Sequence, residues 1–308
     1  FTGFIEVYEQ SAVEMLGDFL LWSPVKFAHH EKLIEQLEQT EVVDAATAVM
    51  ITPGLLHLGR GKVRGVQVFG VEPQRIARVV NLQGACLIHK NQSLERTFAV
   101  PDGPNRIGGL IGIGVAGEPN ELTDQYDHGL IEGFAGKRVM LISGTVEEQV
   151  SSSGRRSIKP KRRSMQFDIT DVVFTGNYLF DRESIYLPLT ALFQELYPRQ
   201  EDVKVERIQI KLAQNADTES ARAQIYGVWQ AFARDHGLSV FSPIIESAVE
   251  LQAPYMGEIR KQMGVLMLIF GIVDCGVILL VFCIFYMIVK LKQKDIGIIK
   301  SCGGSNWT

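Results

Sequence analysis

The sequence predicts an α+β fold, with an extracytoplasmic domain of two subdomains joined to a transmembrane α-helix. Three observations predict it. The chain has 308 residues, and at roughly 100–200 residues per domain this length allows about two domains. Segments with strand-like alternation occur between segments with helical spacing. One apolar run near the C-terminal end is long enough to cross a bilayer.

The first elements alternate between helical and strand patterns. In the segment 29–41, Leu33, Ile34 and Leu37 fall on one face, which predicts an amphipathic helix. Apolar side chains also recur at a rough helical spacing over 3–20. In chain order we expect a helix over 1–22, a strand over 20–28, a helix over 29–41, and strands over 42–51 and 63–71.

The later half repeats this order of elements around a middle region with strands of its own. We expect strands over 136–143, 164–176, 184–189 and 205–213, a helix over 218–237, a strand over 238–243 and a helix over 244–262. The β–α units at 20–71 and 205–243 therefore flank the middle region. The predicted domains are a helix at 1–22, a split subdomain at 23–74 and 204–243, an inserted mixed α/β subdomain at 75–203, a connecting helix at 244–263, a transmembrane helix at 264–289 and a cytoplasmic segment at 290–308.

The apolar run 264–289 predicts the transmembrane helix. Of its 26 residues, 22 are apolar, three are glycine and one is charged. A helix of this length spans about 39 Å, more than the roughly 30 Å of a hydrocarbon core. The segment after it has four lysines and one aspartate, which leaves a net charge of −7 on residues 1–289. Because lysine and arginine in short flanks mark the cytoplasmic side, residues 1–260 are expected outside the cytoplasm.

Asp274 is the one charged residue of the predicted span. Burial of an ionised carboxylate there costs about 2.5–3.5 kcal/mol on insertion scales. We therefore expect Asp274 to face other helices or water, or to be protonated. A functional role and a helix–helix contact beside Cys275 and Gly276 are both open.

Composition and motifs exclude several kinds of protein. A hydrophobic content of 46% excludes a disordered chain, and a net charge of −4 argues against a nucleic-acid partner. Cys86 is the only cysteine in the first 260 residues, so that region has no internal disulfide. The glycine-rich run 112–117 is not followed by a βαβ unit, and His30-Glu31 lacks the second histidine of a zinc motif. We therefore expect no catalytic, cofactor or metal residues, and no enzyme activity in this chain.

A dense basic stretch stands out in the otherwise acidic domain. Residues 151–164 contain six basic residues between two predicted strands, which indicates a long hairpin tip. One interpretation is a solvated, mobile loop. The other is a basic finger held out to an acidic partner or to lipid headgroups.

The segment after the apolar run shows the strongest family resemblance. Residues 294–305 have the sequence KDIGIIKSCGGS. This resembles the segment after the second span of FtsX/MacB-type ABC-transporter permeases, where a short helix contacts the ATPase subunit. The resemblance implies that the ATPase-coupling residues are Lys294, Asp295, Ile296, Gly297, Ile298, Ile299, Lys300, Gly303, Gly304 and Ser305.

The exported part is most similar to lipoprotein-releasing permeases of the LolC/LolE type. The segments that show this similarity are 53–56 (PGLL), 70–73 (GVEP), 136–143 (GKRVMLIS), 167–169 (FDI), 175–181 (TGNYLFD) and 186–189 (YLPL). The resemblance implies four spans per subunit and a two-subdomain periplasmic domain between the first and second. This chain would then begin after the first span and end before the third.

The same resemblance implies a role for the basic stretch. In LolC-type subunits the matching loop forms a hook that recruits the periplasmic lipoprotein carrier. The corresponding residues here are Gly154, Arg155, Arg156, Lys159, Pro160, Lys161, Arg162 and Arg163.

The function that the resemblance implies is a permease subunit coupled to a separate ATPase, which binds the ATP and Mg²⁺. Release of lipoproteins from the inner membrane to a carrier is the main expectation. MacB-like efflux, FtsX-like regulation of cell-wall hydrolases and an ATPase-independent membrane-anchored binding or sensor domain remain as alternatives. The expected partners are the ATPase, a second permease subunit in a homo- or heterodimer, the carrier and the lipid bilayer. The expected location is the bacterial inner membrane, with residues 1 to about 262 in the periplasm.

Overall fold

The structure is a computed structural model in which the chain forms two units, Phe1–Gln252 and Ala253–Thr308. It describes residues 14–59, 61–101, 103, 106–120, 123, 125–126, 129, 131, 133–150, 156–198, 200, 202–238 and 240–303. The side chains of residues 145–150 and 156–160 lie outside this description. The first unit contains a mixed sheet with its helices, and the second contains most of one long helix.

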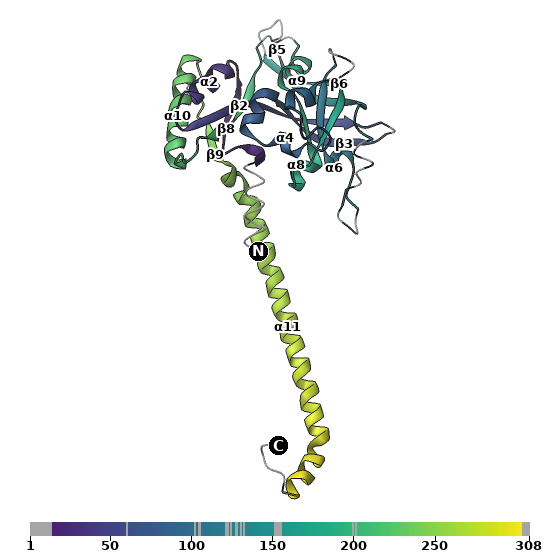
Figure 1. Ribbon diagram of the computed structural model, residues 1–308. Helices are drawn as coiled ribbons and strands as arrows, with labels where there is room; N and C mark the ends of the chain where they lie inside the picture. The colour runs from purple at the N-terminus through teal and green to yellow at the C-terminus, as the bar shows by residue number, and fades with distance from the viewer. Residues whose placement is uncertain are drawn as a thin grey trace. The chain divides into compact units, whose positions relative to one another are not determined.

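The sheet of the first unit joins segments from both ends of the unit (Figure 1). Its order is β3-β7-β4-β6-β5-β2-β8-β1-β9, with a further pairing between β3 and β2. The strands are β1 (Phe19–Phe27), β2 (Val43–His57), β3 (Val63–Val71), β4 (Gly108–Gly112), β5 (Arg138–Val150), β6 (Arg156–Val173), β7 (Ser184–Pro188), β8 (Val205–Leu212) and β9 (Ile244–Ser247).

Six of these strands close on themselves, because β3 pairs with both β7 and β2. The pairs β3–β7 and β4–β6 are parallel, and the other pairs of this ring are antiparallel. A closed ring has no free strand edge among its members. Leu56, Val68, Leu141, Phe167 and Leu187, one from each of five strands of the ring, are buried in the same hydrophobic cluster.

The long strand β2 belongs both to this ring and to the β8–β1–β9 extension. Its first part pairs with β8 from Val43 to Val49, and its second part pairs with β3 from Val49 to His57. On one face of the extension lie α2 (His30–Glu38) and α10 (Thr218–Asp235), which contact each other. The other face packs against α3 (Pro73–Val79). Side chains of β2 alternate between the two faces, with Ala46 in one hydrophobic cluster and Ala45 in the other.

Short helices cover the ring: α4 (Leu82–Ala85), α5 (Leu94–Phe98), α6 (Ile113–Ala116), α8 (Tyr178–Glu183) and α9 (Leu189–Leu196). The glycine-rich run 112–117 spans the end of β4 and all of α6. A Cβ atom on Gly112 would lie 2.3 Å from the Asp181 carbonyl oxygen, and one on Gly114 would lie 2.8 Å from the Arg182 Cα. These two glycines therefore allow α6 to pack closely against α8.

The mixed α/β class and the apolar C-terminal helix are confirmed, but two predicted boundaries are wrong. Residues 14–16 are helical, but β1 begins at Phe19, inside the helix predicted over 1–22. The predicted strand 238–243 is not a strand in its described residues, and β9 occupies Ile244–Ser247 at the start of the predicted helix. Pairing with β1 explains the second shift, because Ile244 to Ser247 lie in register with Trp22 to Phe19.

The long helix α11 runs from Ala248 to Ser301, with Pro254 inside it. Its segment Met256–Asp295 is the one described helix that is long and apolar enough to cross a membrane, with a mean hydropathy of 2.8. Apolar side chains are exposed along it from Val265 to Val289; Leu268 is 63% exposed and Phe282 is 66% exposed. A helix that is apolar on every side is expected in lipid or among other helices.

Candidate functional site

The start of α11 is held by a capping box. The Glu250 backbone N–H donates to the Ser247 hydroxyl (3.2 Å), and the Ser247 backbone N–H donates to a Glu250 carboxylate oxygen (2.8 Å). These reciprocal bonds satisfy two donors at the helix N-terminus. The pattern Ser-x-x-Glu at 247–250 is the sequence signal for this motif, and it places the start of the helix at Ala248.

Arg222 on α10 joins the same site. Its Nη2 donates to both carboxylate oxygens of Glu250, at 2.7 and 2.8 Å, and its Nη1 donates to the Ile245 carbonyl at 3.1 Å. The bonds from the Ser247 backbone N–H and from the Arg222 guanidinium hold the pKa of Glu250 below its ordinary value. We call Arg222, Ile245, Ser247 and Glu250 the α11 junction.

The α11 junction connects three elements of the first unit: α10, the edge strand β9 and the first turn of α11. One guanidinium nitrogen, Nη2, bonds the carboxylate while Nη1 bonds a backbone carbonyl, so the planar group is oriented by two separate partners. The guanidinium also lies over the Phe19 ring, 5.3 Å from its centre. Arg222 thus attaches the first turn of α11 to α10 and to the sheet.

The basic stretch lies in the hairpin of β5 and β6. These strands pair continuously from Arg138 opposite Asp168 to Val150 opposite Arg156. The pairing of β5 with β2 ends at Ser143, and the pairing of β6 with β4 begins at Asp168. Over 144–150 and 156–162, the described strands therefore pair only with each other. We call this two-stranded part the β5–β6 ribbon.

The described basic residues lie along β6 and not in a loop, which corrects the expectation of a hairpin tip. Arg156, Lys159 and Pro160 lie in β6 opposite Val150, Glu147 and Val146, and Lys161, Arg162 and Arg163 lie opposite Thr145, Gly144 and Ser143. The predicted strand 164–176 thus begins earlier, because pairing with β5 extends it. Arg162 is exposed, whereas Lys161 and Arg163 are half-buried. Gly154 and Arg155 lie outside the described residues.

The base of the hairpin contains a buried carboxylate. Asp168 is 2% exposed and accepts hydrogen bonds from Arg106 and from Arg138 Nε. Burial by itself would raise the pKa of Asp168, but the bonds and charges of the two arginines outweigh it and lower the pKa. This cluster fixes the point where the hairpin leaves the ring.

In its described residues, 294–303, the predicted coupling segment continues α11 to Ser301 and forms no separate helix. Lys294, Asp295, Gly297, Ile298, Ile299 and Lys300 lie in its last turns, as does the backbone of Ile296. Ile298 and Ile299 are each 62% exposed. Gly303 follows the helix with a positive φ of 87°, which suits a C-terminal cap. Gly304 and Ser305 lie outside the described residues, and Asp274 is an exposed residue of α11.

The described residues contain no group of three or more His, Cys, Asp or Glu side chains that could hold a metal ion. Cys86 is buried, and burial together with the nearby Asp171 charge raises its pKa to about 12. A thiol with this pKa is a poor nucleophile at neutral pH.

Comparison with known proteins finds similarity at the level of structure. No protein-family model and no curated protein matches this chain. The chain is similar to the periplasmic region of MacB from Actinobacillus actinomycetemcomitans, at 10% identity and a TM-score of 0.44, over 82% of this chain and 98% of that one. It is also similar to the extracellular domain of the noncanonic ABC-type transporter YknZ from Gram-positive bacteria, at 10% identity and a TM-score of 0.43, over 74% of this chain and 98% of that one.

Proposed function

We propose that this chain is a permease subunit of an FtsX/MacB-type ABC transporter, which couples ATP hydrolysis by a separate ATPase to work outside the membrane. The continuity of α11 is the observation that carries the proposal. One helix begins at the α11 junction, includes the apolar segment Met256–Asp295 and ends beyond Lys294–Lys300. The chain thus has a continuous path from a predicted ATPase contact to the α/β unit.

The orientation in the membrane is part of the proposal. Lys290, Lys292, Lys294 and Lys300 follow the apolar run 264–289, which favours the cytoplasmic side for this end. Residues 1 to about 262 then lie in the periplasm of a bacterial inner membrane. The ATPase holds the ATP and Mg²⁺, and this subunit supplies no catalytic group.

The mechanism that we propose is a rigid-body switch. ATPase movement displaces residues 294–305, and α11 passes this displacement to the α11 junction. Arg222 and Glu250 then transmit it to α10 and the sheet, so that the α/β unit changes posture between two states. A second permease subunit in a homo- or heterodimer provides the surface against which the unit moves.

The cargo that we propose is a lipid-anchored protein. Exposure of an acyl chain to water costs about 0.8 kcal/mol per CH₂, so extraction needs an energy source and a shielding carrier. The β5–β6 ribbon, with the exposed Arg162, is the proposed contact for that carrier. MacB-like efflux and FtsX-like regulation of cell-wall hydrolases use the same coupling and differ in what the periplasmic unit contacts.

Co-purification of the intact subunit with its ATPase tests the coupling. Gly297→Pro removes a backbone donor from the last turns of α11 and clashes with the preceding turn, so we expect loss of the ATPase with the α/β unit still folded. Gly297→Ala, which keeps the helix, is the matched control. Retention of the ATPase by Gly297→Pro and by a deletion of 296–299 would contradict the coupling. A chain that never binds an ATPase would instead be a membrane-anchored sensor.

Identification of the bound cargo then separates the outputs. An acylated protein in the purified complex supports lipoprotein release. A small molecule with an outer-membrane channel supports efflux, and a cell-wall hydrolase supports the FtsX-like output.

A further inference from the structure

A pocket of about 870 Å³ lies at one end of the closed ring, where β2 ends, β3 and β5 begin and α6 follows β4. His57, the last residue of β2, pairs with Val63 of β3 and with Met140 of β5, so these strands meet at this end. Small-molecule sites of about 300–1,000 Å³ are common in the mouths of β-barrels. The pocket belongs wholly to the first unit and shares no residue with the α11 junction or with the β5–β6 ribbon.

One part of the pocket wall is apolar. Leu58, Ala116 and Phe134 line the pocket, and all three are half-buried and pack against the buried hydrophobic cluster. Removal from water of the apolar surface that they still expose is favourable. This part of the wall therefore suits the apolar body of a ligand.

The other part of the wall is positively charged. It carries Lys62, Arg64 and Lys137, and Glu118 is the one carboxylate among the described lining residues. Three positive charges against one negative charge leave the lining with a formal charge of +2, whereas the whole chain has −4. A local excess of positive charge raises the concentration of anions at the site.

Arg64 is held at the pocket by a backbone carbonyl as well as by a carboxylate. Its Nη1 donates to the Gly114 carbonyl at 3.1 Å, and its Nη2 donates to a Glu118 carboxylate oxygen at 3.4 Å. The Glu118 side chain is 79% exposed, so this ion pair contributes little to stability. The bond to Gly114 thus keeps the guanidinium in place, and an anionic ligand can replace Glu118 as its second partner.

The two lysines are available to a ligand. Within the described part of the chain, neither the Lys62 nor the Lys137 ammonium has an ion-pair partner. The Lys137 ammonium lies over the Phe134 ring, 4.4 Å from its centre, so this charge stands at the border of the apolar wall. Ammonium and guanidinium groups are donors only, and they bind carboxylate and phosphate oxygens through charge-assisted hydrogen bonds.

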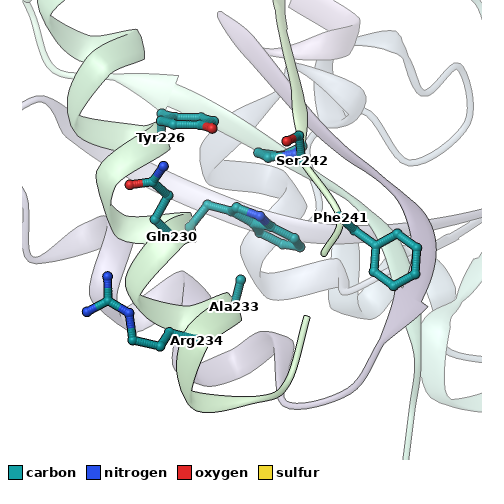
Figure 2. Close-up of a pocket in the computed structure, with 8 residues that line it drawn as sticks. Tyr226, Gln230, Ala233, Arg234, Phe241 and Ser242 are labelled. Carbon is teal, nitrogen blue, oxygen red and sulfur yellow. The ribbon is translucent and has the colours of Figure 1, made fainter. Parts of the chain in front are cut away.

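A smaller pocket, of about 220 Å³, lies beside Trp229 between α10 and the segment that joins α10 to β9 (Figure 2). Arg234 is the one charged residue among its described lining residues. A single exposed charge does not define a ligand, whereas the mouth of the ring combines three cations with an apolar wall.

We propose that the mouth of the ring binds a small organic oxyanion with an apolar body. Its acidic group, a carboxylate or a phosphate monoester, is held by Lys62, Arg64 and Lys137, and its apolar body covers Leu58 and Phe134. The proposal does not depend on the function proposed above, because it uses neither α11 nor the β5–β6 ribbon.

Isothermal titration calorimetry of the full chain in phosphatidylcholine nanodiscs, with empty nanodiscs as the blank, tests the site. The probes are 2-naphthyl phosphate and 2-naphthoate, the uncharged 2-naphthamide, and inorganic phosphate, which has no apolar body. We expect a naphthyl anion to bind, and the amide and inorganic phosphate to bind about tenfold more weakly or less. The tighter of the two naphthyl anions identifies the acidic group. Binding of that anion should weaken as salt is added.

Lys62→Glu and Lys137→Glu are the decisive variants. Both side chains are exposed, and backbone hydrogen bonds to Gly59 and Leu58 close the turn at Lys62, so these variants are expected to fold. Arg96→Glu is the matched control, because it changes the charge equally and lies on α5, beside the start of β4 at the other end of the ring. We expect each lysine variant to weaken the preferred anion by about tenfold and the control to leave its affinity unchanged.

Three results would overturn the proposal. The first is that neither naphthyl anion binds, and the second is that the original chain binds the amide as tightly as the anions. Neither of these measurements needs a variant. The third is a loss of affinity in the lysine variants that is no larger than in Arg96→Glu, with thermal unfolding curves that match those of the original chain.

Discussion

Arg222 and Glu250 are 28 positions apart in the chain, yet the Arg222 guanidinium nitrogen Nη2 contacts both oxygens of the Glu250 carboxylate, at 2.7 and 2.8 Å. The same carboxylate accepts from the Ser247 backbone N–H, so one side chain both caps α11 and ties it to α10. Local helix formation and tertiary attachment therefore depend on a single group.

Arg222→Ala is expected to loosen the start of α11 more than it lowers global stability. It removes the bonds to Glu250 and to the Ile245 carbonyl, at a cost of about 1 kcal/mol because the pair is partly exposed. Hydrogen exchange at the Ser247 and Glu250 amides should become faster, whereas amides of β8 should be unaffected. Arg222→Lys, which keeps the charge but has no second nitrogen for the Ile245 carbonyl, should be intermediate. Unchanged exchange in Arg222→Ala would contradict the role of the junction.

Charge reversal on the β5–β6 ribbon is expected to weaken binding of a periplasmic partner. The variant replaces Arg155, Arg156, Lys161 and Arg162 by glutamate, so attraction to an acidic surface becomes repulsion. A pull-down at low salt should show the loss, and added salt should reduce the difference from the original chain. Arg96→Glu again serves as the control for charge alone. The hook assignment is wrong if affinity at low salt does not change.

The cysteines provide a test of topology. We expect Cys302, which follows α11 and is exposed, to react with a membrane-impermeant maleimide only from the cytoplasmic side. Cys86 should not react in the folded chain, because burial raises its pKa to about 12 and blocks access. In inside-out vesicles Cys302 should be labelled, and in right-side-out vesicles it should be protected. Labelling of Cys302 in right-side-out vesicles would reverse the proposed orientation.

Asp168→Asn is expected to destabilise the first unit at neutral pH by about 2 kcal/mol, because two arginines lose a buried carboxylate. The pKa of Asp168 is lowered by folding, so its contribution is complete above the pKa of the unfolded chain, roughly 3.9. The contribution is lost as the pH falls through the lower pKa of the folded chain. The stability difference between the two forms should therefore begin to shrink below about pH 4 and disappear only once the pH is below the lower pKa of the folded chain. A difference that stayed constant with pH would exclude the ionised pair.

The elements that depend on near neighbours were predictable from the sequence. The helical spacing of Leu33, Ile34 and Leu37 locates α2, and the apolar run 264–289 locates the membrane-crossing part of α11. The closed ring was not predictable, because the parallel pairs β3–β7 and β4–β6 join distant segments that carry no pairing signal in a single sequence. The roles proposed for residues 154–163 and 294–305 stay predictions.

Two features of the site were missed for different physical reasons. The capping box Ser247–Glu250 is a local signal that was present in the sequence. The contact from Arg222 depends on how α10 packs, so no local pattern indicates it. The same holds for the pocket beside Trp229, whose two walls come from a helix and from the segment after it.

Strand β2 connects the two parts of the sheet in the first unit through continuous backbone pairing. Val43–Val49 is hydrogen-bonded to β8, and Gly54–His57 of the same strand is bonded to β5, whose far end forms the ribbon. An unbroken ladder of backbone bonds thus leads from the helices beside α11 out to the ribbon. A small rotation of the sheet at the β8 end is therefore expected to produce a larger displacement at the far end of the ribbon. Strands β2 and β5 join the two places through backbone hydrogen bonds.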